Sequence, residues 1–431
     1  MAERPLVHKF GGAVLRSPEG FAAMAQRLHE SDGQPLLVVI SALGRVTREL
    51  EQAAADAERG EYGRALERLH HLVEQHQRYA AQLLGSQGQQ HVATILDETA
   101  AQLQGYLEGI AITGELTPRT LDLVRSFGER WALALVAAFL RECGFPVVAV
   151  DATELLCTDA RHGMARPLLE QTAQSVERSL RPLLRPGQVV LTQGFIARSL
   201  RGEITTMGQE SSALTAVLLA ALVGAEELQV WTDVPGVRTC DPSVVPEAEL
   251  LPALSYGQAR RIAQAGLRLL YPAAIACAER WNICLRIRSA FTPEAGETVV
   301  SSVPGELVPM IIGREGVWLL AGTSAEMEAV LPLSSVDGST VLARWEDPES
   351  CSVVVSSDIP PYARAVAEGA LLTVLAAEQR QVACLLPLCG QLLSAGQLLR
   401  LWYTGEELRC FVAAPTYEPA LRALWGELQR R

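Results

Sequence analysis

The segment Leu6-Val7-His8-Lys9-Phe10-Gly11-Gly12 joins an apolar run to a lysine and a pair of glycines. The apolar run predicts a buried strand over Leu6–Phe10. The glycines predict a tight turn after that strand, whose backbone amides can face the oxygens of a phosphate. A strand that ends in such a turn is typical of α/β folds, which bind ligands at the carboxyl ends of their strands.

Lys9 is the only lysine in the chain, since every other residue in the Lys+Arg total of 37 is arginine. Lysine is a compact charge on a slim stem, whereas arginine is a wide planar fork. A crowded phosphate pocket beside backbone amides favours the narrower cation. Survival by chance is the alternative, and the neighbouring glycine pair favours the phosphate interpretation.

The composition is that of an ordinary globular protein, with 49% hydrophobic and 20% charged residues. The length of 431 residues predicts two or three domains. The formal net charge of −12 argues against nucleic acid and anionic membrane surfaces as partners. We find no apolar run long enough to span a membrane and no signal-peptide core, so we expect a cytoplasmic protein.

Nine cysteines lie between Cys143 and Cys410, with no CxxC pair. Most of them are expected to be small buried side chains in a reducing compartment. Their spacing does not predict a structural zinc site, and we expect no metal held by protein side chains alone.

The first three hundred residues alternate apolar strand-like runs with helical periods, which predicts an α/β architecture with a largely parallel sheet. Residues 46–139 have a mostly helical, polar pattern and predict a helical insertion. The expected strands are Leu6–Phe10, Leu36–Ser41, Pro146–Val150, Gln188–Thr192 and Leu228–Trp231. The expected helices outside the insertion are Pro18–Glu30, Ser211–Val223, Tyr256–Ala265 and Pro272–Trp281.

The pattern changes near residue 290, and the remaining chain fits two small α+β modules. Its expected strands include Val308–Ile312, Val317–Ala321 and Ser352–Val355. Its expected helices are Pro361–Leu375 and Pro415–Gln429.

Four loops at strand ends or helix starts carry small and polar residues, the positions at which open α/β sheets bind ligands. Each also has a purely structural explanation, because hydroxyls before a helix are common N-caps and Asp-Val-Pro-Gly is a common turn. The chain contains no GxxxxGK[ST] segment, so the first loop is not a Walker loop. The four loops are Lys9–Gly12, Ser41–Thr47, Thr205–Ser212 and Trp231–Val237.

The order of these loops resembles that of the aspartate kinases, in the amino acid kinase superfamily. Seven segments recur in sequence over residues 5–300, including the start of KFGGTS, the GER segment and a WTDVxGVxTxDP segment. The matching segments are Lys9–Gly12, Ser41–Thr47, Gly128–Arg130, Gln193–Gly208, Trp231–Pro242, Leu254–Tyr256 and Leu270–Pro272.

The resemblance implies an amino acid kinase-like three-layer sandwich over residues 1–300, with the helical insertion, and a regulatory region over residues 303–431 with two ACT-like modules. It implies phosphorylation by ATP of the side-chain carboxylate of L-aspartate to 4-phospho-L-aspartate, the first step toward lysine, threonine and methionine. Mg²⁺ would be held mainly through the phosphates of ATP. A homodimer through the C-terminal modules and an amino-acid effector are further implied partners.

The resemblance also implies roles for individual residues, with Lys9 and Asp233 as the catalytic pair. Without it, Glu129 would be interpreted as a solvated acid on a helix. For Asp233, an Asx turn and a nucleotide ligand would be equally good interpretations. The implied ATP-binding residues are Lys9, Phe10, Gly11, Gly12, Thr232, Asp233, Arg238, Ser243, Arg268 and Leu269. The implied substrate-binding residues are Ser41, Thr47, Glu129, Gln209, Glu210, Ser211 and Ser212.

The chain departs from the family pattern at several of these positions. Gln209 replaces the arginine expected to clamp the substrate carboxylate, and Ala213 replaces an active-site aspartate. A neutral amide cannot supply the charge of a bidentate guanidinium. Arg238 stands where a tyrosine is usual and Ser243 where an arginine is usual, whereas Arg268 keeps the charge of a phosphate-binding lysine.

Three functions therefore compete: an aspartate kinase, a kinase for another amino acid or small carboxylate, and a catalytically weak homologue that binds nucleotide or amino acid. An Arg45 or Arg198 side chain that reaches into the pocket would favour the first, and exposure of both would count against it. Feedback control is expected to be absent or altered, because neither module has a clear glycine-rich effector turn. The candidate turns are Gly322-Thr323-Ser324 and Cys389-Gly390-Gln391.

Overall fold

The computed structural model divides into two compact units, unit 1 (Met1–Pro235 with Ala276–Glu297) and unit 2 (Gly236–Ile275 with Thr298–Arg431). The structure describes residues 4–31, 33–208, 210–269, 271–306, 308–322, 341–347, 350–355, 365–376, 378–404 and 407–430.

Unit 1 contains a parallel sheet with the strand order β3-β5-β2-β1-β8-β10. The central strand β2 is apolar and buried along its whole length, as expected for a parallel strand covered on both faces. Five of the strands confirm the sequence predictions to within two residues. These five are β1 (Leu6–Phe10), β2 (Leu36–Ile40), β3 (Val147–Ala149), β5 (Val189–Gln193) and β8 (Glu227–Thr232). The sixth strand of the sheet is β10 (Cys284–Ser289).

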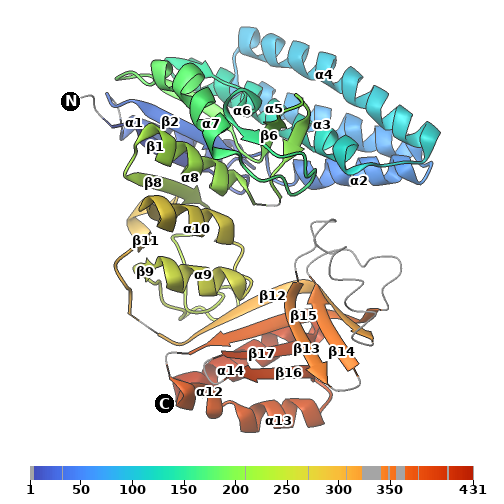
Figure 1. Cartoon of the computed structure of the whole chain (residues 1–431), viewed down its shortest axis with the longest axis vertical. Helices are drawn as coiled ribbons and strands as arrows, with labels where there is room; N and C mark the ends of the chain where they lie inside the picture. The colour runs from blue at the N-terminus through green and yellow to red at the C-terminus, as the bar shows by residue number, and fades with distance from the viewer. Residues whose placement is uncertain are drawn as a thin grey trace. The chain divides into compact units, whose positions relative to one another are not determined.

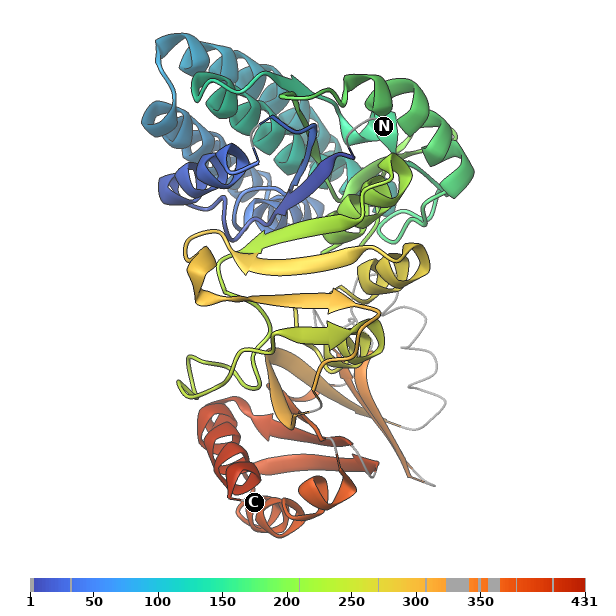
Figure 2. The same cartoon turned by 90° about the vertical axis from the view of Figure 1, so that its left-hand side faces the viewer.

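Helices cover both faces of this sheet, which confirms the predicted three-layer sandwich. Helix α5 (Pro118–Glu142) packs on β2, β3 and β5, and α8 (Ser212–Val223) packs on β1, β2 and β8. Figure 2 shows unit 1 with its early helices, including α1 (Pro18–His29), on one side of the sheet and α8 on the other. Helix α8 is apolar on almost every face and ends at Gly224, whose left-handed φ of 80° suits a glycine cap.

The predicted insertion consists of four helices packed side by side (Figure 1). Its core is continuous with that of the sheet, because one cluster of buried side chains includes Phe10 of β1, Trp131 of α5 and Leu107 of α4. The insertion is therefore built into the sandwich through α5. The other three helices are α2 (Val46–Glu58), α3 (Tyr62–Leu83) and α4 (Ser86–Thr113).

A second, small sheet in unit 1 has the order β4-β6-β7. Strands β6 and β7 form an antiparallel hairpin, and β4 pairs with β6 in parallel. These strands are β4 (Cys157–Thr158), β6 (Ile196–Ser199) and β7 (Ile204–Thr206), and the short helices beside them are α6 (Ala152–Leu155) and α7 (Leu169–Ser175).

Unit 2 contains a six-stranded antiparallel sheet with the order β13-β14-β12-β15-β17-β16. Helices α12 to α14 lie on one of its faces (Figure 1), an arrangement that fits the predicted ACT-like modules. The strands are β12 (Met310–Gly322), β13 (Val341–Asp347), β14 (Ser350–Val355), β15 (Ala365–Leu375), β16 (Leu398–Thr404) and β17 (Glu407–Ala413). The helices are α12 (Gln379–Ala383), α13 (Leu386–Ser394) and α14 (Tyr417–Gln429).

Unit 2 also holds β9 (Ala253–Ser255), which pairs in parallel with residues 299–301 of β11 (Glu297–Ser301). Helix α9 (Tyr256–Gln264) follows β9 and begins in a capping box formed by Ser255 and Gln258. The sequence predicted α9 and α10 (Pro272–Trp281) correctly.

Two predictions for the C-terminal region were wrong. The predicted helix Pro361–Leu375 is in fact strand β15 over its described part, because β15 pairs with strands on both sides and this pairing overrides the helix propensity of its alanines and leucines. The predicted strands Val308–Ile312 and Val317–Ala321 are confirmed as strand from Met310 onward, and both belong to the single strand β12. The candidate turn at Cys389 lies inside helix α13. Residues 323 and 324 of the other candidate turn lie outside the described residues.

Within the parts of the chain that the structure describes, every helix is too short or too polar to cross a membrane. The eight cysteines whose surroundings are described are all free thiols.

The shared core of the insertion can be tested with two substitutions in α4. Leu107→Ala removes a side chain that is fully buried, and we expect it to lower the free energy of unfolding by about 2–5 kcal/mol. Ile112→Ala removes a side chain that is 77% exposed, and its effect is expected to stay below about 0.5 kcal/mol. Urea denaturation followed by circular dichroism measures both. Equal effects would contradict a continuous core.

Candidate active site

The carboxyl ends of β1, β2 and β8 meet at one edge of the unit 1 sheet, because the three strands are adjacent and parallel. The glycine pair follows β1, Ser41 follows β2, and Asp233 follows β8. The fold therefore brings together three of the four loops singled out in the sequence. The fourth, which begins at the end of β7, leads into α8.

The glycine pair lies where backbone from two other strands approaches it closely. The Gly11 amide donates to the Trp231 carbonyl at 3.3 Å, and the Gly12 carbonyl accepts from the Gly44 amide at 3.1 Å. A Cβ on Gly12 would lie 2.6 Å from the Ala42 carbonyl oxygen, closer than real Cβ contacts allow. Glycine is thus required here by close packing of backbone rather than by an unusual φ angle.

Lys9 directs its ammonium over this turn, since a Cβ built on Gly11 would lie 3.2 Å from Lys9 Nζ. Burial lowers the pKa of the Lys9 ammonium, and the negative charges of Glu210 and Glu129 oppose this shift. Lys9 is half-buried. A partly desolvated cation beside backbone amides is a favourable site for an anion, because water screens it less than at the open surface.

Glu129 lies on α5 and is only 2% exposed, so its interpretation as a solvated helix acid was wrong. Burial raises the pKa of its carboxyl to about 8, although a hydrogen bond from the Ala42 amide and the charge of Lys9 both act to lower it. Its Oε2 atom has no hydrogen-bond partner among the described residues. A buried acceptor without a donor is costly, and a ligand ammonium would satisfy it.

Gly128 explains how Glu129 comes so close to the end of β2. A Cβ on Gly128 would lie 3.0 Å from Val46 Cγ1 and 3.4 Å from Ala42 Cβ. The absence of a side chain lets α5 pass close to the first turn of α2. Thr47, in that turn, and Ser41, just before it, are both half-buried.

The N-terminus of α8 supplies two further hydroxyls. Ser211 is fully buried, and its Oγ atom has no hydrogen-bond partner within the described residues, whereas Ser212 packs against Gly194 of the β5–β6 turn. Helix N-termini favour anions through their free amides and dipole. Glu210 precedes them in a left-handed conformation with φ of 64°, and Gln209 lies outside the described residues.

Asp233 lies at the open side of this edge, with its side chain 31% exposed. Its carboxylate accepts hydrogen bonds from the Thr232 hydroxyl at 3.2 Å and from Arg16 Nη2 at 3.3 Å. The Arg16 side chain is itself 61% exposed, so this ion pair contributes little to stability and can be exchanged for other partners.

Comparison with known proteins identifies the family of this chain. Residues 4–289 match the family model described as the amino acid kinase family. The chain belongs to the amino acid kinase family.

Among relatives, aspartokinase 2, chloroplastic, of Arabidopsis thaliana is 30% identical over 303 residues, which cover 69% of this chain and 55% of that protein. The aspartokinase of Thermus thermophilus is 36% identical over 211 residues, which cover 48% of this chain and 51% of that protein.

Solved structures show the same fold along nearly the whole chain. Escherichia coli aspartokinase III in complex with aspartate and ADP superposes with a TM-score of 0.80 at 23% identity, covering 99% of this chain and 100% of that one. The same enzyme in complex with lysine and aspartate gives a TM-score of 0.74 at 24% identity, covering 99% and 100%. The chain spans about half the length of the curated relatives it matches.

Four residues predicted to bind nucleotide in this amino acid kinase belong to unit 2. Arg238 donates to the Ala248 carbonyl at 2.6 Å, and Ser243 donates twice to Asp241 Oδ1 in an Asx-type turn. Arg268 is exposed and Leu269 is half-buried. Their role in nucleotide binding stays a prediction.

Arg45 and Arg198, the two candidates for replacing the missing clamp, are both exposed. Exposure of both was expected to count against an unmodified aspartate site, and the alternative acceptors therefore stay open.

Sequence reasoning missed several residues that shape the site. Arg16 contacts Asp233 across more than two hundred residues, and the Ala42 amide donates to Glu129. The buried Trp231 indole donates to His8 Nδ1 at 2.9 Å, which fixes β8 beside β1. These contacts join distant segments, so no local sequence pattern predicts them.

The raised pKa of Glu129 predicts a pH dependence of stability. Because burial raises this pKa from 4.5 to about 8, the folded chain keeps a proton that the unfolded chain releases. The resulting stability is fully present below the unfolded value and is lost as pH rises through about 8. Between about pH 5 and about pH 9, we expect the wild type to lose more free energy of unfolding than Glu129→Gln.

Urea denaturation at several pH values measures this difference, with Glu108→Gln as the control. Glu108 is an exposed glutamate on α4, so its variant is expected to follow the wild type. Parallel pH profiles for all three proteins would contradict a neutral, buried Glu129.

Proposed function

We propose that this member of the amino acid kinase family transfers the γ-phosphoryl group of ATP to the side-chain carboxylate of L-aspartate. The observation that carries the proposal is the placement of Lys9 Nζ over Gly11, with the open carboxylate of Glu129 close enough to affect its charge. The curated relatives are named aspartokinases, and one solved structure of the same fold is described as a complex with aspartate and ADP.

The chemistry needs no general base, because a carboxylate is already a nucleophile near neutral pH. Catalysis then depends on positioning and on neutralising the charge of the transferring phosphoryl group. Lys9 and the amides of the glycine turn would hold that group. Glu129 would accept from the ammonium of the acceptor, with Ser41, Thr47, Ser211 and Ser212 donating to its carboxylates.

Within unit 1, Thr232 and Asp233 would hold the nucleotide. The nucleotide-binding roles that the family resemblance implies for Arg238, Ser243, Arg268 and Leu269 stay predictions. Among the described residues, we find no group of three or more carboxylate, histidine or cysteine side chains that could hold a metal ion. Mg²⁺ would be held mainly through the phosphate oxygens of ATP, as the family resemblance implies, with the carboxylate of Asp233 nearby. When bound, Mg²⁺ would neutralise phosphate charge.

We further propose that residues 1–300 form the catalytic domain and residues 303–431 a regulatory region through which two copies associate. The six-stranded sheet supports this proposal, because its edge strands β13 and β16 are free to pair within the described part of the sheet. An amino-acid effector and a cytoplasmic location remain predictions. Light scattering and lysine titration of the kinase reaction test the dimer and the effector.

A kinase for a different small carboxylate is the second candidate. The exposure of Arg45 and Arg198 favours it, because neither supplies the charge that Gln209 lacks. The extra negative charge of Glu210 near Lys9 also favours an acceptor with fewer carboxylates than aspartate.

Trapping acyl phosphate with hydroxylamine tests the proposal directly, with ATP and either aspartate or glutamate. We expect product with aspartate, and a loss of about a hundredfold or more in Lys9→Ala, because the cation that stabilises the transferring phosphoryl group is removed. Arg45→Ala and Arg198→Ala are the matched controls and are expected to stay within about twofold of the wild type.

Product with another carboxylate alone would support the second candidate. ATP binding without product from any carboxylate would show a catalytically silent homologue.

The raised pKa of Glu129 also predicts how acceptor affinity responds to pH. Burial of the carboxyl holds this pKa at about 8, and only the ionised form pairs with an ammonium group. The KM for aspartate is therefore expected to fall about fivefold from about pH 7 to about pH 8 and to level off above that. Glu129→Gln should give a higher KM that does not vary with pH. A wild-type KM that is equally flat would contradict the assigned pairing.

A further inference from the structure

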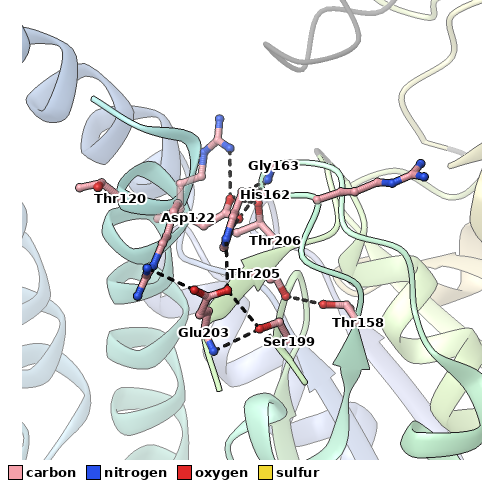
Figure 3. A network of polar contacts seen from close by, with 12 residues as sticks. Thr120, Asp122, Thr158, His162, Gly163, Ser199, Glu203, Thr205 and Thr206 are labelled. Atoms are coloured by element: carbon pink, nitrogen blue, oxygen red, sulfur yellow. Dashed lines mark hydrogen bonds and ion pairs between the residues drawn. The ribbon is translucent and has the colours of Figure 1, made fainter. Parts of the chain in front are cut away.

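Asp122 is a fully buried carboxylate that neither the family resemblance nor the proposed mechanism uses. The Gly163 amide donates to both of its oxygens at 3.0 Å, and His162 Nδ1 lies 2.9 Å from Oδ2. The Thr206 hydroxyl donates to Oδ1, and Arg125 Nη1 lies 3.8 Å away. Figure 3 shows these groups converging on the carboxylate.

The position of Asp122 connects two parts of the candidate site. It precedes Glu129 by seven residues in α5, and seven residues are two helical turns, so both side chains lie on the same face of the helix. Thr206 is the last residue of β7, and the chain that follows it leads through residues 207–212 into α8. We call the described residues 207, 208 and 210–212 the acceptor loop, since they include Ser211 and Ser212.

Thr206 is held on its backbone as well as its side chain. Its carbonyl accepts from the Ala165 amide at 2.9 Å, and the next residue, Met207, donates to the Phe195 carbonyl at 3.1 Å. The hydrogen bond to Asp122 is the contact that ties this strand end to α5. The acceptor loop therefore begins from a point fixed relative to the helix that carries Glu129.

The rest of the network fixes the segment around His162 to the β6–β7 hairpin. His162 Nε2 lies 3.8 Å from Glu203 Oε2, and Ser199 donates to the same oxygen at 3.4 Å. Arg119, at the start of α5, lies 3.2 Å from the other Glu203 oxygen. Figure 3 shows Glu203 and Ser199 beside the Thr158–Thr205 pair, whose hydroxyls are 2.6 Å apart.

A buried carboxylate is a poor way to gain stability, because its desolvation offsets much of the attraction to its partners. A buried carboxylate can instead fix the geometry of its surroundings, since one carboxylate can hold four groups from three segments in a single arrangement. A well-packed apolar residue could fill the space at similar stability, but it would remove the side-chain link between the strand end and α5.

We propose that Asp122 is a positioning residue that fixes the acceptor loop relative to Glu129 through its hydrogen bond with Thr206. The proposal rests on the proposed kinase function, because Ser211 and Glu129 are taken to bind the same acceptor molecule. A shift of the loop by a fraction of an ångström would spoil acceptor binding and leave the glycine turn and the nucleotide residues untouched.

Thr206→Val tests this link, because it keeps the shape of the side chain and removes only its donor. The KM for the acceptor is expected to rise about tenfold, with the KM for ATP within about twofold. Thr206→Ser restores the hydroxyl and should bring the acceptor KM back to within about threefold of the wild type.

Thr158→Val is the matched control. Thr158 is a buried threonine in the same small sheet, and its hydroxyl pairs with Thr205 instead of Asp122. Both valine variants lose one buried hydrogen bond, so both are expected to lose similar stability. If both variants lose stability and neither changes the acceptor KM, Asp122 is structural only and the proposal is overturned.

Hydrogen exchange of the acceptor loop amides gives a readout that does not depend on activity. We expect faster exchange over residues 207, 208 and 210–212 in Thr206→Val than in the wild type or Thr158→Val. Unchanged exchange overturns the positioning role, whatever the kinetics show. If the wild type makes no acyl phosphate with any carboxylate, the kinase function fails, and the exchange result alone decides whether Asp122 positions the loop.

Discussion

The structure depends on the convergence of two ionisable groups, Lys9 and Glu129, at one edge of the unit 1 sheet. Burial disfavours the charged form of each, and each favours the charged form of the other. The fold therefore has to bring the end of β1 and the middle of α5 together. The glycine turn and Gly128 make this possible, because each removes a side chain at a point where backbone or helix has to pass closely.

The helical insertion contributes to the same arrangement of Lys9 and Glu129. Helix α5 is both the last helix of the insertion and a layer of the sandwich, so a residue of the insertion can lie at the edge of the sheet. The continuous core from Phe10 to Leu107 holds that helix in place over its full length. Asp122, two turns from Glu129, then connects the helix to the strand that leads into α8. The acceptor side of the site is thus assembled from segments that are far apart in the sequence.

The chemistry of the site is more acidic than the family pattern implies. Gln209 and Ala213 replace an arginine and an aspartate, the exposed Arg45 and Arg198 do not supply the lost charge, and Glu210 adds a negative charge near Lys9. An acceptor with two carboxylates would have to rely on hydroxyls and helix amides, which are weaker partners than a guanidinium. The proposed phosphoryl transfer depends on Lys9, the glycine turn and Asp233, which this chain keeps, so the departures from the family pattern affect the acceptor side of the site.

The sequence by itself determined the α/β class, the strands that carry the glycine turn and Asp233, the helical insertion and the family. These features depend on local periodicity, on turn residues and on short segments in a fixed order, all of which can be read along the chain. It did not predict β15, whose helix-favouring residues form a strand because strands pair with it on both sides. Only the tertiary structure decided that Glu129 is buried with a raised pKa, that Arg45 and Arg198 are exposed, and that Asp122 holds Thr206. Burial and long-range hydrogen bonds depend on which segments meet in space, and no local pattern in the chain encodes that.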